Sequence, residues 1–261
     1  FTFNYGLYYQ TPVYQSIYLN TNRLEDPEDL FEEGEGQVGN ATIGAERTQD
    51  YSVAFNVQVG ESWAYSFGAW VRDMDQMTRF SHERSGVYTY QISTNGDYGS
   101  ARGLDLTLEW RRAFFGSQLQ YTYSISKANS EYAWQSISGQ YVDAPSQEFI
   151  TYFDRPHGLT YYAYTFLPFG IQAGLTANYQ SGYPYTPIIF RGKDPVTDER
   201  NRNSKRGPGT RNVNISFSKY LMVMNHKIAL GLNFFNVLDI RNPIDVYAMT
   251  GKPDDPGTYY T

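Results

Sequence analysis

Strict alternation of apolar and polar residues is the feature that most constrains how this 261-residue chain can fold. In the segment 50–59, Tyr51, Phe55 and Val59 share one face with other apolar residues, and Asn56 and Gln58 lie on the other. A period of two is the side-chain period of a β-strand, because successive side chains point to opposite faces of a sheet. The sequence therefore predicts an all-β chain whose strands each carry one apolar and one polar face.

The alternation recurs along the whole chain, and no helix longer than a turn or two is expected. Strands are predicted at 1–9, 50–59, 63–72, 104–110, 119–125, 157–166, 171–180, 212–218 and 228–234, with a tenth candidate at 244–249. Short connections are predicted at 60–62, 111–116, 167–170 and 220–226, and long ones at 10–46, 73–98, 127–155 and 181–210. Tight turns at one end of an antiparallel meander and large loops at the other are typical of outer-membrane β-barrels.

Two architectures compete for strands with one apolar face. A soluble β-sandwich hides that face in a core about 10 Å thick, whereas a membrane barrel turns it to lipid and its polar face to a wet lumen. The apolar faces of the six most regular strands carry no charged residue, and the opposite faces are rich in Gln, Asn, Ser and Thr. We therefore predict an antiparallel transmembrane β-barrel segment of nine or ten strands. Either a tenth strand closes a small barrel, or the strands are one arc of a larger barrel, since an open edge has no hydrogen-bond partner in lipid.

Composition and the absence of chemical motifs exclude other classes. The net charge is −6, which argues against a nucleic-acid-binding protein. The chain has no cysteine, and no stretch approaches 18 consecutive apolar residues, the length of a transmembrane helix. His82, His157 and His226 fall in separate predicted connections or strands and form no zinc set, and no serine nucleophile elbow is present. We expect neither an enzyme nor a catalytic residue, a metal site or a cofactor.

Several stretches resemble the barrel of TonB-dependent outer-membrane receptors. The matching stretches are FTFNYGLYYQTP at 1–12, GAERTQDYSVAFNVQVGESWAYSFGAWVRDMDQM at 44–77, NGDYGSARGLDLTLEW at 95–110, SGYPYTP at 181–187 and LNFFNVLDIRNPIDVYAMTGKPDDPG at 232–257. The last is the most specific. The resemblance is greatest to the receptors that carry a carboxypeptidase-like regulatory domain.

This resemblance implies a barrel of about 22 strands around a plug domain, with the TonB box outside the barrel. We therefore expect residues 1–261 to be the C-terminal part of such a barrel, without plug, TonB box or closing strand. The implied function is active uptake of a siderophore, oligosaccharide or peptide across the outer membrane of a Gram-negative cell. The implied partners are outer-membrane lipid, lipopolysaccharide, the protein's own plug and the TonB complex.

Two other functions remain open at the level of the sequence. The first is a barrel that transports nothing and anchors a surface-exposed partner protein. The second is a soluble all-β adhesin or glycan-binding module.

Aromatic and basic residues of the long connections are the candidate ligand contacts. Aromatic rings stack on sugars or planar chelates, and arginine recognises anions through two parallel hydrogen bonds. The candidates are Tyr132, Trp134, Tyr141, Tyr183, Tyr185, Arg191, Arg200 and Arg202. The competing interpretation is that the aromatic rings pack the loops onto their neighbours and that the basic residues belong to a solvated loop of mixed charge.

Overall fold

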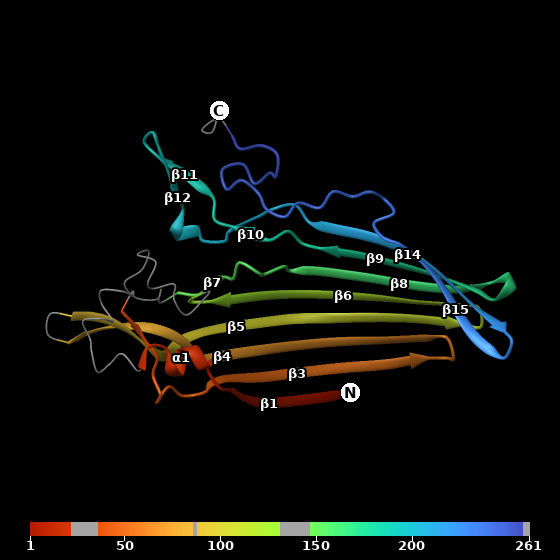
Figure 1. The fold of residues 1–261 in the computed structure, drawn as a ribbon, viewed down its shortest axis with the longest axis horizontal. Coiled ribbons are helices and arrows are strands. Elements are labelled where there is room, and N and C mark those ends of the chain that lie inside the picture. The colour runs from red at the N-terminus through yellow and green to blue at the C-terminus, as the bar shows by residue number, and fades with distance from the viewer. Residues whose placement is uncertain (22–35, 86–87, 131–146, 258–261) are drawn as a thin grey trace.

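Nine antiparallel strands lie side by side in one sheet, in the order in which they follow along the chain (Figure 1). The structure is a computed structural model that describes residues 1–21, 36–85, 88–130 and 147–257. The nine strands are β1 (Thr2–Gln10), β3 (Glu46–Val59), β4 (Trp63–Ser85), β5 (Tyr88–Arg112), β6 (Phe115–Ala128), β8 (His157–Leu167), β9 (Ile171–Gln180), β14 (Thr210–Val223) and β15 (His226–Phe234). All nine strands predicted from the alternation are present, so the predicted all-β, antiparallel class is confirmed.

Short helices and short strands lie in the connections between the strands of this sheet. The helix α1 (Tyr14–Tyr18) has five residues, and η3 (Pro168–Gly170) and η4 (Glu199–Asn201) are single 3-10 turns. β2 (Gln37–Val38) pairs in parallel with β5, and β7 (Phe149–Ile150) pairs with β6. Two further small sheets join β10 (Pro184–Tyr185) to β13 (Lys205–Arg206), and β11 (Ile188–Arg191) to β12 (Asp194–Thr197).

The two ends of the sheet differ, as the sequence predicts. Tight turns join β3 to β4, β5 to β6, β8 to β9 and β14 to β15 at the turn end, on the right in Figure 1. The long connections gather at the opposite end, which we call the loop end. One predicted long connection is wrong: 73–98 is not a loop, because β4 and β5 continue through it as a paired hairpin. The hairpin contains several Tyr and Thr residues, which favour strands, although its alternation is weaker.

The predicted tenth strand at 244–249 is also wrong. These residues form a loop that lies against the β10–β13 segment, and the Ala248 carbonyl accepts a hydrogen bond of 3.2 Å from the Ile188 N–H. Pro243 has no N–H to donate to a ladder, and Gly251 closes the following turn at φ 71°. Both residues act against a continuous strand here.

The sheet has an apolar face and a polar face, and neither forms a conventional core. On β3 and β4, Phe55 is 54% exposed and Phe67 is 49% exposed, and these two residues are register partners on the apolar face. Among the described residues, only Val38, Phe80, Ala128 and Ala163 are buried hydrophobic side chains. A soluble sandwich would bury one face of its sheet, so the uncovered apolar face argues against the soluble alternative.

The apolar face has the height of a membrane-spanning band. On β5 it consists of Leu104, Leu106, Leu108 and Trp110, with Arg102 before this run and Arg112 after it on the same face. The interval from Arg102 to Arg112 is ten residues long and spans about 33 Å along the strand, which corresponds to about 25 Å across a membrane at a tilt of about 40°. Aromatic pairs flank the band at both ends: Tyr5 and Tyr51 lie with ring centroids 5.1 Å apart toward the loop end. At the turn end Trp63 stacks on Trp110 with ring centroids 5.6 Å apart.

Glycines on the polar face make room for large aromatic side chains. Trp70 lies directly over its register partner Gly103, where a Cβ atom would be 2.5 Å from the indole ring. Tyr164 covers Gly116 in the same way on the next pair of strands but one. A side chain at either glycine would displace the ring, so these glycines serve close packing across the sheet.

Candidate ligand-binding site

The candidate site lies at the loop end, where three segments from different connections come together. We call these segments the loop cluster: residues 149–157, 181–211 and 242–251. Asp154 lies at its centre, with a side chain only 1% exposed. Its carboxylate accepts a hydrogen bond of 2.6 Å from the Ser126 N–H and forms an ion pair with Arg206. Arg206 also donates to the Asp154 carbonyl at 2.7 Å, so this pair ties the 181–211 segment to the 149–157 segment.

Arg155 makes a second connection within the loop cluster. Its Nε donates to the Ser181 carbonyl at 2.6 Å, a terminal nitrogen donates to the Thr210 hydroxyl, and its guanidinium lies 4.5 Å above the ring of Tyr183. Asn203 makes the third connection: it is buried and donates to the Ile150 carbonyl at 2.7 Å. These contacts hold the long 181–211 connection in one arrangement.

Seven of the eight predicted ligand residues divide into three groups in this structure, and the eighth, Tyr185, lines a crevice together with Tyr183. Tyr132, Trp134 and Tyr141 lie outside the described residues. Tyr183 and Arg202 are engaged in the loop cluster, since Tyr183 lies under Arg155 and Arg202 lies 4.6 Å above the ring of Phe149. Arg191 and Arg200 are exposed and form no ion pair with any described residue. The described candidates all belong to the 181–211 segment, and the structure does not join them in one binding pocket.

Tyr183 and Tyr185 line only a narrow crevice. Its other walls are Gly207, Pro208 and residues 243–246, and its volume is about 40 Å³. Binding pockets for small molecules are typically about 300–1,000 Å³, and one water takes about 30 Å³ in the liquid. The crevice is too small for a nutrient molecule, so in this arrangement Tyr183 and Tyr185 offer a surface contact.

A larger polar hollow lies beside the loop cluster, on strands β8, β9 and β14. Its volume is about 280 Å³, and Thr160, Asn178, Gln180 and Asn212 line it on the polar face. Thr160 donates to the Asn178 side-chain oxygen at 3.1 Å, whereas the Asn212 side-chain oxygen is buried without a hydrogen-bond partner. We did not single out these residues in the sequence. The signal available was their regular spacing on the polar face, which also marks every other position on that face.

A charged network covers the polar face near the loop end of β3 to β6. Arg72 pairs with Asp50, and its guanidinium lies 5.1 Å from the ring centroid of Trp70. The Trp70 indole N–H donates to Asp105 at 2.9 Å, and the Thr122 hydroxyl donates to the other oxygen of Asp105 at 2.6 Å. These hydrogen bonds connect four strands along a surface that no described layer covers.

Two arrangements typical of catalysis or metal binding are not found among the described residues. Asp105 and Glu109, four residues apart on one strand, are about 13 Å apart, too far to act as a pair of glycosidase carboxylates. In the described ranges no group of three or more His, Cys, Asp or Glu side chains is arranged to hold a metal ion. No helix among the described residues is long and apolar enough to cross a membrane.

Together these features define a class: the wall of an outer-membrane-type β-barrel, with an apolar outer face, a polar inner face and ordered loops at one end. No protein-family model matches the sequence, and no curated protein matches it. Solved structures of this class do match.

The outer membrane transporter YddB from Escherichia coli matches with a TM-score of 0.68 at 12% identity, over 91% of this chain and 34% of that chain. The copper transporter OprC matches with a TM-score of 0.53 at 11% identity, over 96% of this chain and 32% of that chain. The FrpB iron transporter from Neisseria meningitidis (F3-3 variant) matches with a TM-score of 0.53 at 13% identity, over 76% and 28%. The chain thus spans about a third of the length of these proteins and shares their fold.

Proposed function

We propose that this chain supplies wall strands and outer loops to a TonB-dependent outer-membrane transporter that takes up a nutrient. The observation that carries the proposal is the sheet whose apolar face, flanked by aromatic pairs, has the height of a membrane band and is covered by no layer of described residues. Its fold-level likeness to three transporters supports the same conclusion.

The asymmetry of the connections supports one orientation. Outer-membrane barrels have short turns on the periplasmic side and long loops on the extracellular side. In this proposal the turn end faces the periplasm, and the loop cluster and the β4–β5 hairpin project from the cell.

The polar face supports a filled lumen. Tyr162, Tyr164 and Phe166 form an aromatic ladder on that face near the turn end, with centroid separations of 6.0 and 5.8 Å. Phe166 is 49% exposed. Aromatic rings on an otherwise polar inner wall are suited to packing against another domain. We propose that a plug domain of the same protein packs there, and that TonB acts on that plug from the periplasm.

The ligand would first meet the loop end. The unpaired Arg191 and Arg200 suit an anionic group, and the amides and hydroxyls of the polar hollow suit a ligand rich in hydrogen-bonding groups. A ferric siderophore, an oligosaccharide and a peptide all meet these requirements.

Uptake measurements test the proposal. Cells that carry the protein, and cells in which its gene is deleted, are given a radiolabelled ferric siderophore, an oligosaccharide or a short peptide. We expect one class to accumulate only in cells that carry the protein, and a protonophore or loss of TonB to abolish accumulation. Accumulation that persists without TonB would contradict the energy coupling, and equal accumulation of all three classes in both strains would contradict transport.

A non-transporting anchor is a second candidate, and one observation favours it. Val13, Tyr14 and Tyr18 at α1 are 65%, 81% and 61% exposed, at the loop end where a surface partner would bind. In this case, recovery of the protein from outer membranes would yield a stoichiometric partner protein. The Tyr14→Ser variant would release that partner, and no tested nutrient would accumulate.

A further inference from the structure

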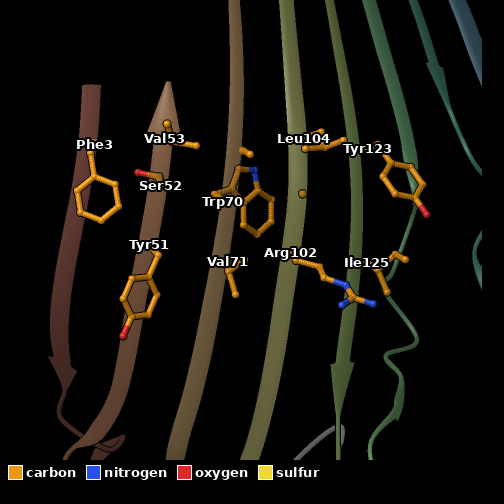
Figure 2. A pocket seen from close by; sticks show the side chains of 12 residues that line it. Phe3, Tyr51, Ser52, Val53, Trp70, Val71, Arg102, Leu104, Tyr123 and Ile125 are labelled. Carbon is orange, nitrogen blue, oxygen red and sulfur yellow. The ribbon is translucent and has the colours of Figure 1, made fainter. Parts of the chain in front are cut away.

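The apolar face contains a groove across strands β1, β3, β4, β5 and β6 (Figure 2). Its volume is about 400 Å³, and Phe3, Tyr51, Leu104 and Tyr123 are among its lining residues. Ala69 is the smallest lining side chain on this face, and its register partners are Val53 and Leu104. A small residue between larger neighbours leaves a depression, and this one has the apolar character that suits an alkyl chain.

Arg102 is the charged residue among those that line the groove, and it lies at the loop-end side. Arg102 is exposed on the apolar face, between its register partners Val71 and Ile125. Figure 2 shows its side chain extending from β5 toward Ile125 of β6, away from β4. Arg102 forms no ion pair or side-chain hydrogen bond with any described residue.

The neighbourhood of Arg102 contains charges of both signs. Lys127 lies on the same face, diagonal to Arg102 across β5 and β6, a spacing of roughly 7–8 Å between backbones. Asp73 lies diagonally on β4, and Glu148 accepts a hydrogen bond of 3.1 Å from Ser100. Because the Arg102 side chain leans toward β6, its guanidinium is directed to the side of Lys127 and not of Asp73.

The position of Arg102 in the apolar band decides what it can bind. An arginine on the lipid face costs about 2–4 kcal/mol at the membrane midplane but only about 0–1 near the interface. Arg102 lies at the boundary of the band, where its stem can lie along the groove and its guanidinium can reach the headgroup level. A phosphate group there would receive two parallel hydrogen bonds and neutralise the charge.

We propose that this groove and Arg102 form a binding site for the lipid A part of lipopolysaccharide. One acyl chain occupies the groove, and a phosphate binds to Arg102 with support from Lys127. The inference rests on the proposed function, because the loop end must face the outer leaflet, where lipid A supplies the phosphates. It adds a lipid site on the outside of the wall, separate from the surfaces that meet the transported nutrient.

The test uses the purified, delipidated full-length protein and native mass spectrometry with bisphosphorylated lipid A or its dephosphorylated form. We expect the Arg102→Gln variant to bind bisphosphorylated lipid A about tenfold more weakly than the wild type. Arg112→Gln is the matched control, since Arg112 lies on the same strand and face at the other end of the band, and it should bind as the wild type does. The Ala69→Phe variant, which fills the groove, should weaken the binding of both lipid forms.

Three results would overturn the inference. The first is that the Arg102→Gln and Arg112→Gln variants bind bisphosphorylated lipid A with equal affinity. The second is that the wild type binds the two lipid forms equally well. The third is that the Ala69→Phe variant binds both lipid forms as the wild type does. A retained β-sheet circular dichroism spectrum shows that each variant is folded. Failure of the proposed function is a different outcome, since a protein that is absent from the outer membrane would fail in localisation before any lipid is added.

Discussion

At the scale of single residues, the charged side chains near the loop end divide into those that hold the structure together and those that are free. Arg47 pairs with Asp75, and Asp50 pairs with Arg72, so two register-matched ion pairs cross β3 and β4 in opposite senses. Asp154 and Arg206 form a third ion pair, which joins two segments of the loop cluster. Arg102, Arg191 and Arg200 have no acidic partner among the described residues and remain available to an anion.

The Asp154→Ala variant should loosen the loop cluster. It removes the acceptor for the Ser126 N–H and leaves Arg206, whose side chain is 28% exposed, without its counter-charge. We expect a local loss of about 2 kcal/mol, equivalent to a roughly 30-fold drop in hydrogen-exchange protection at Ser126 and across 181–211. Asp194→Ala is the control, because Asp194 is exposed and forms no ion pair among the described residues. Equal exchange in the two variants would contradict the structural role of Asp154.

Asp97 predicts a pH dependence of the β4–β5 hairpin beyond the apolar band. Burial raises the pKa of the Asp97 carboxyl above its ordinary value of 3.8, against hydrogen bonds from Asn129 and Ser130 and the charge of Arg79, which lower it. The folded hairpin therefore holds a proton that the unfolded chain has already released, so its stability falls as pH rises through the interval from 3.8 to the raised pKa.

The Asp97→Asn variant should remove this dependence, because its amide cannot ionise. Hydrogen exchange of 76–98, corrected for the intrinsic effect of pH, is measured from about pH 4 to about pH 7. Asp73→Asn serves as the control at an exposed position on β4. A pH slope in Asp97→Asn as steep as in the wild type would refute the assignment to this carboxyl.

The ligand contacts could be predicted from the sequence only by residue type and loop position. Residue type and loop position selected Arg191 and Arg200, and these are exposed cations in the structure. The same criteria could not show that Tyr183 lies under Arg155 or that Arg202 lies over Phe149, because each contact joins segments separated by dozens of residues. Thr160, Asn178 and Asn212 form a hollow only through the register of three strands, which a single strand pattern does not contain.

At the scale of elements, the alternation of apolar and polar residues predicts strands where one face of the strand is apolar. It does not predict them where neither face is apolar. The nine strands of the sheet follow directly from it. The loop-end half of β4 and β5 did not, because the 36–40 segment pairs with β5 and polar side chains of the hairpin bond to neighbouring segments. Asn95 donates to the Gln76 carbonyl at 2.7 Å and accepts from the Gly44 N–H at 2.8 Å. A register shift between Met74 and Thr78 marks the point where the two halves meet.

The two faces of β4 should react differently with a water-soluble thiol reagent. The chain has no cysteine, so single substitutions give an unambiguous readout. Ser66 lies on the polar face and Phe67, the next residue, on the apolar face. In native outer membranes we expect a charged maleimide to label the Ser66→Cys variant and to leave the Phe67→Cys variant unlabelled. A lipid-soluble maleimide should label Phe67→Cys, and the reverse pattern would invert the assignment of the faces.

At the scale of the whole molecule, the sheet is an arc with two edges. β1 pairs only with β3, and β15 pairs only with β14, so each has one edge that no described strand satisfies. Unpaired backbone groups cost several kcal/mol each in hydrocarbon, so both edges require further strands in a membrane. The sequence left two alternatives open, a small barrel closed by a tenth strand or one arc of a larger barrel, and the residues of the expected tenth strand form a loop in the structure. Which strands complete the barrel is not contained in the alternation, because every strand of such a barrel has the same pattern.

The membrane-inserted protein should therefore be larger than this chain. Its species in outer membranes, measured by native mass spectrometry in detergent, is expected to exceed 29.9 kDa clearly, either as a longer polypeptide or as an assembly. Far-ultraviolet circular dichroism checks that the species is folded. A folded, membrane-inserted monomer of 29.9 kDa would show that the free edges of β1 and β15 pair with each other, and the sheet would then be a small closed barrel.

Trp70 gives this wall an optical reporter of its own. Its indole lies on Gly103 and donates to Asp105 on the polar face, whereas Trp63 and Trp110 stack together on the apolar face, and Trp134 lies outside the described residues. The emission wavelength of Trp70 would shift with the exposure of the polar face to water. Brominated acyl chains would quench the fluorescence of Trp63 and Trp110. The same intrinsic fluorescence can thus follow events inside the barrel and in the surrounding bilayer separately, with no attached dye.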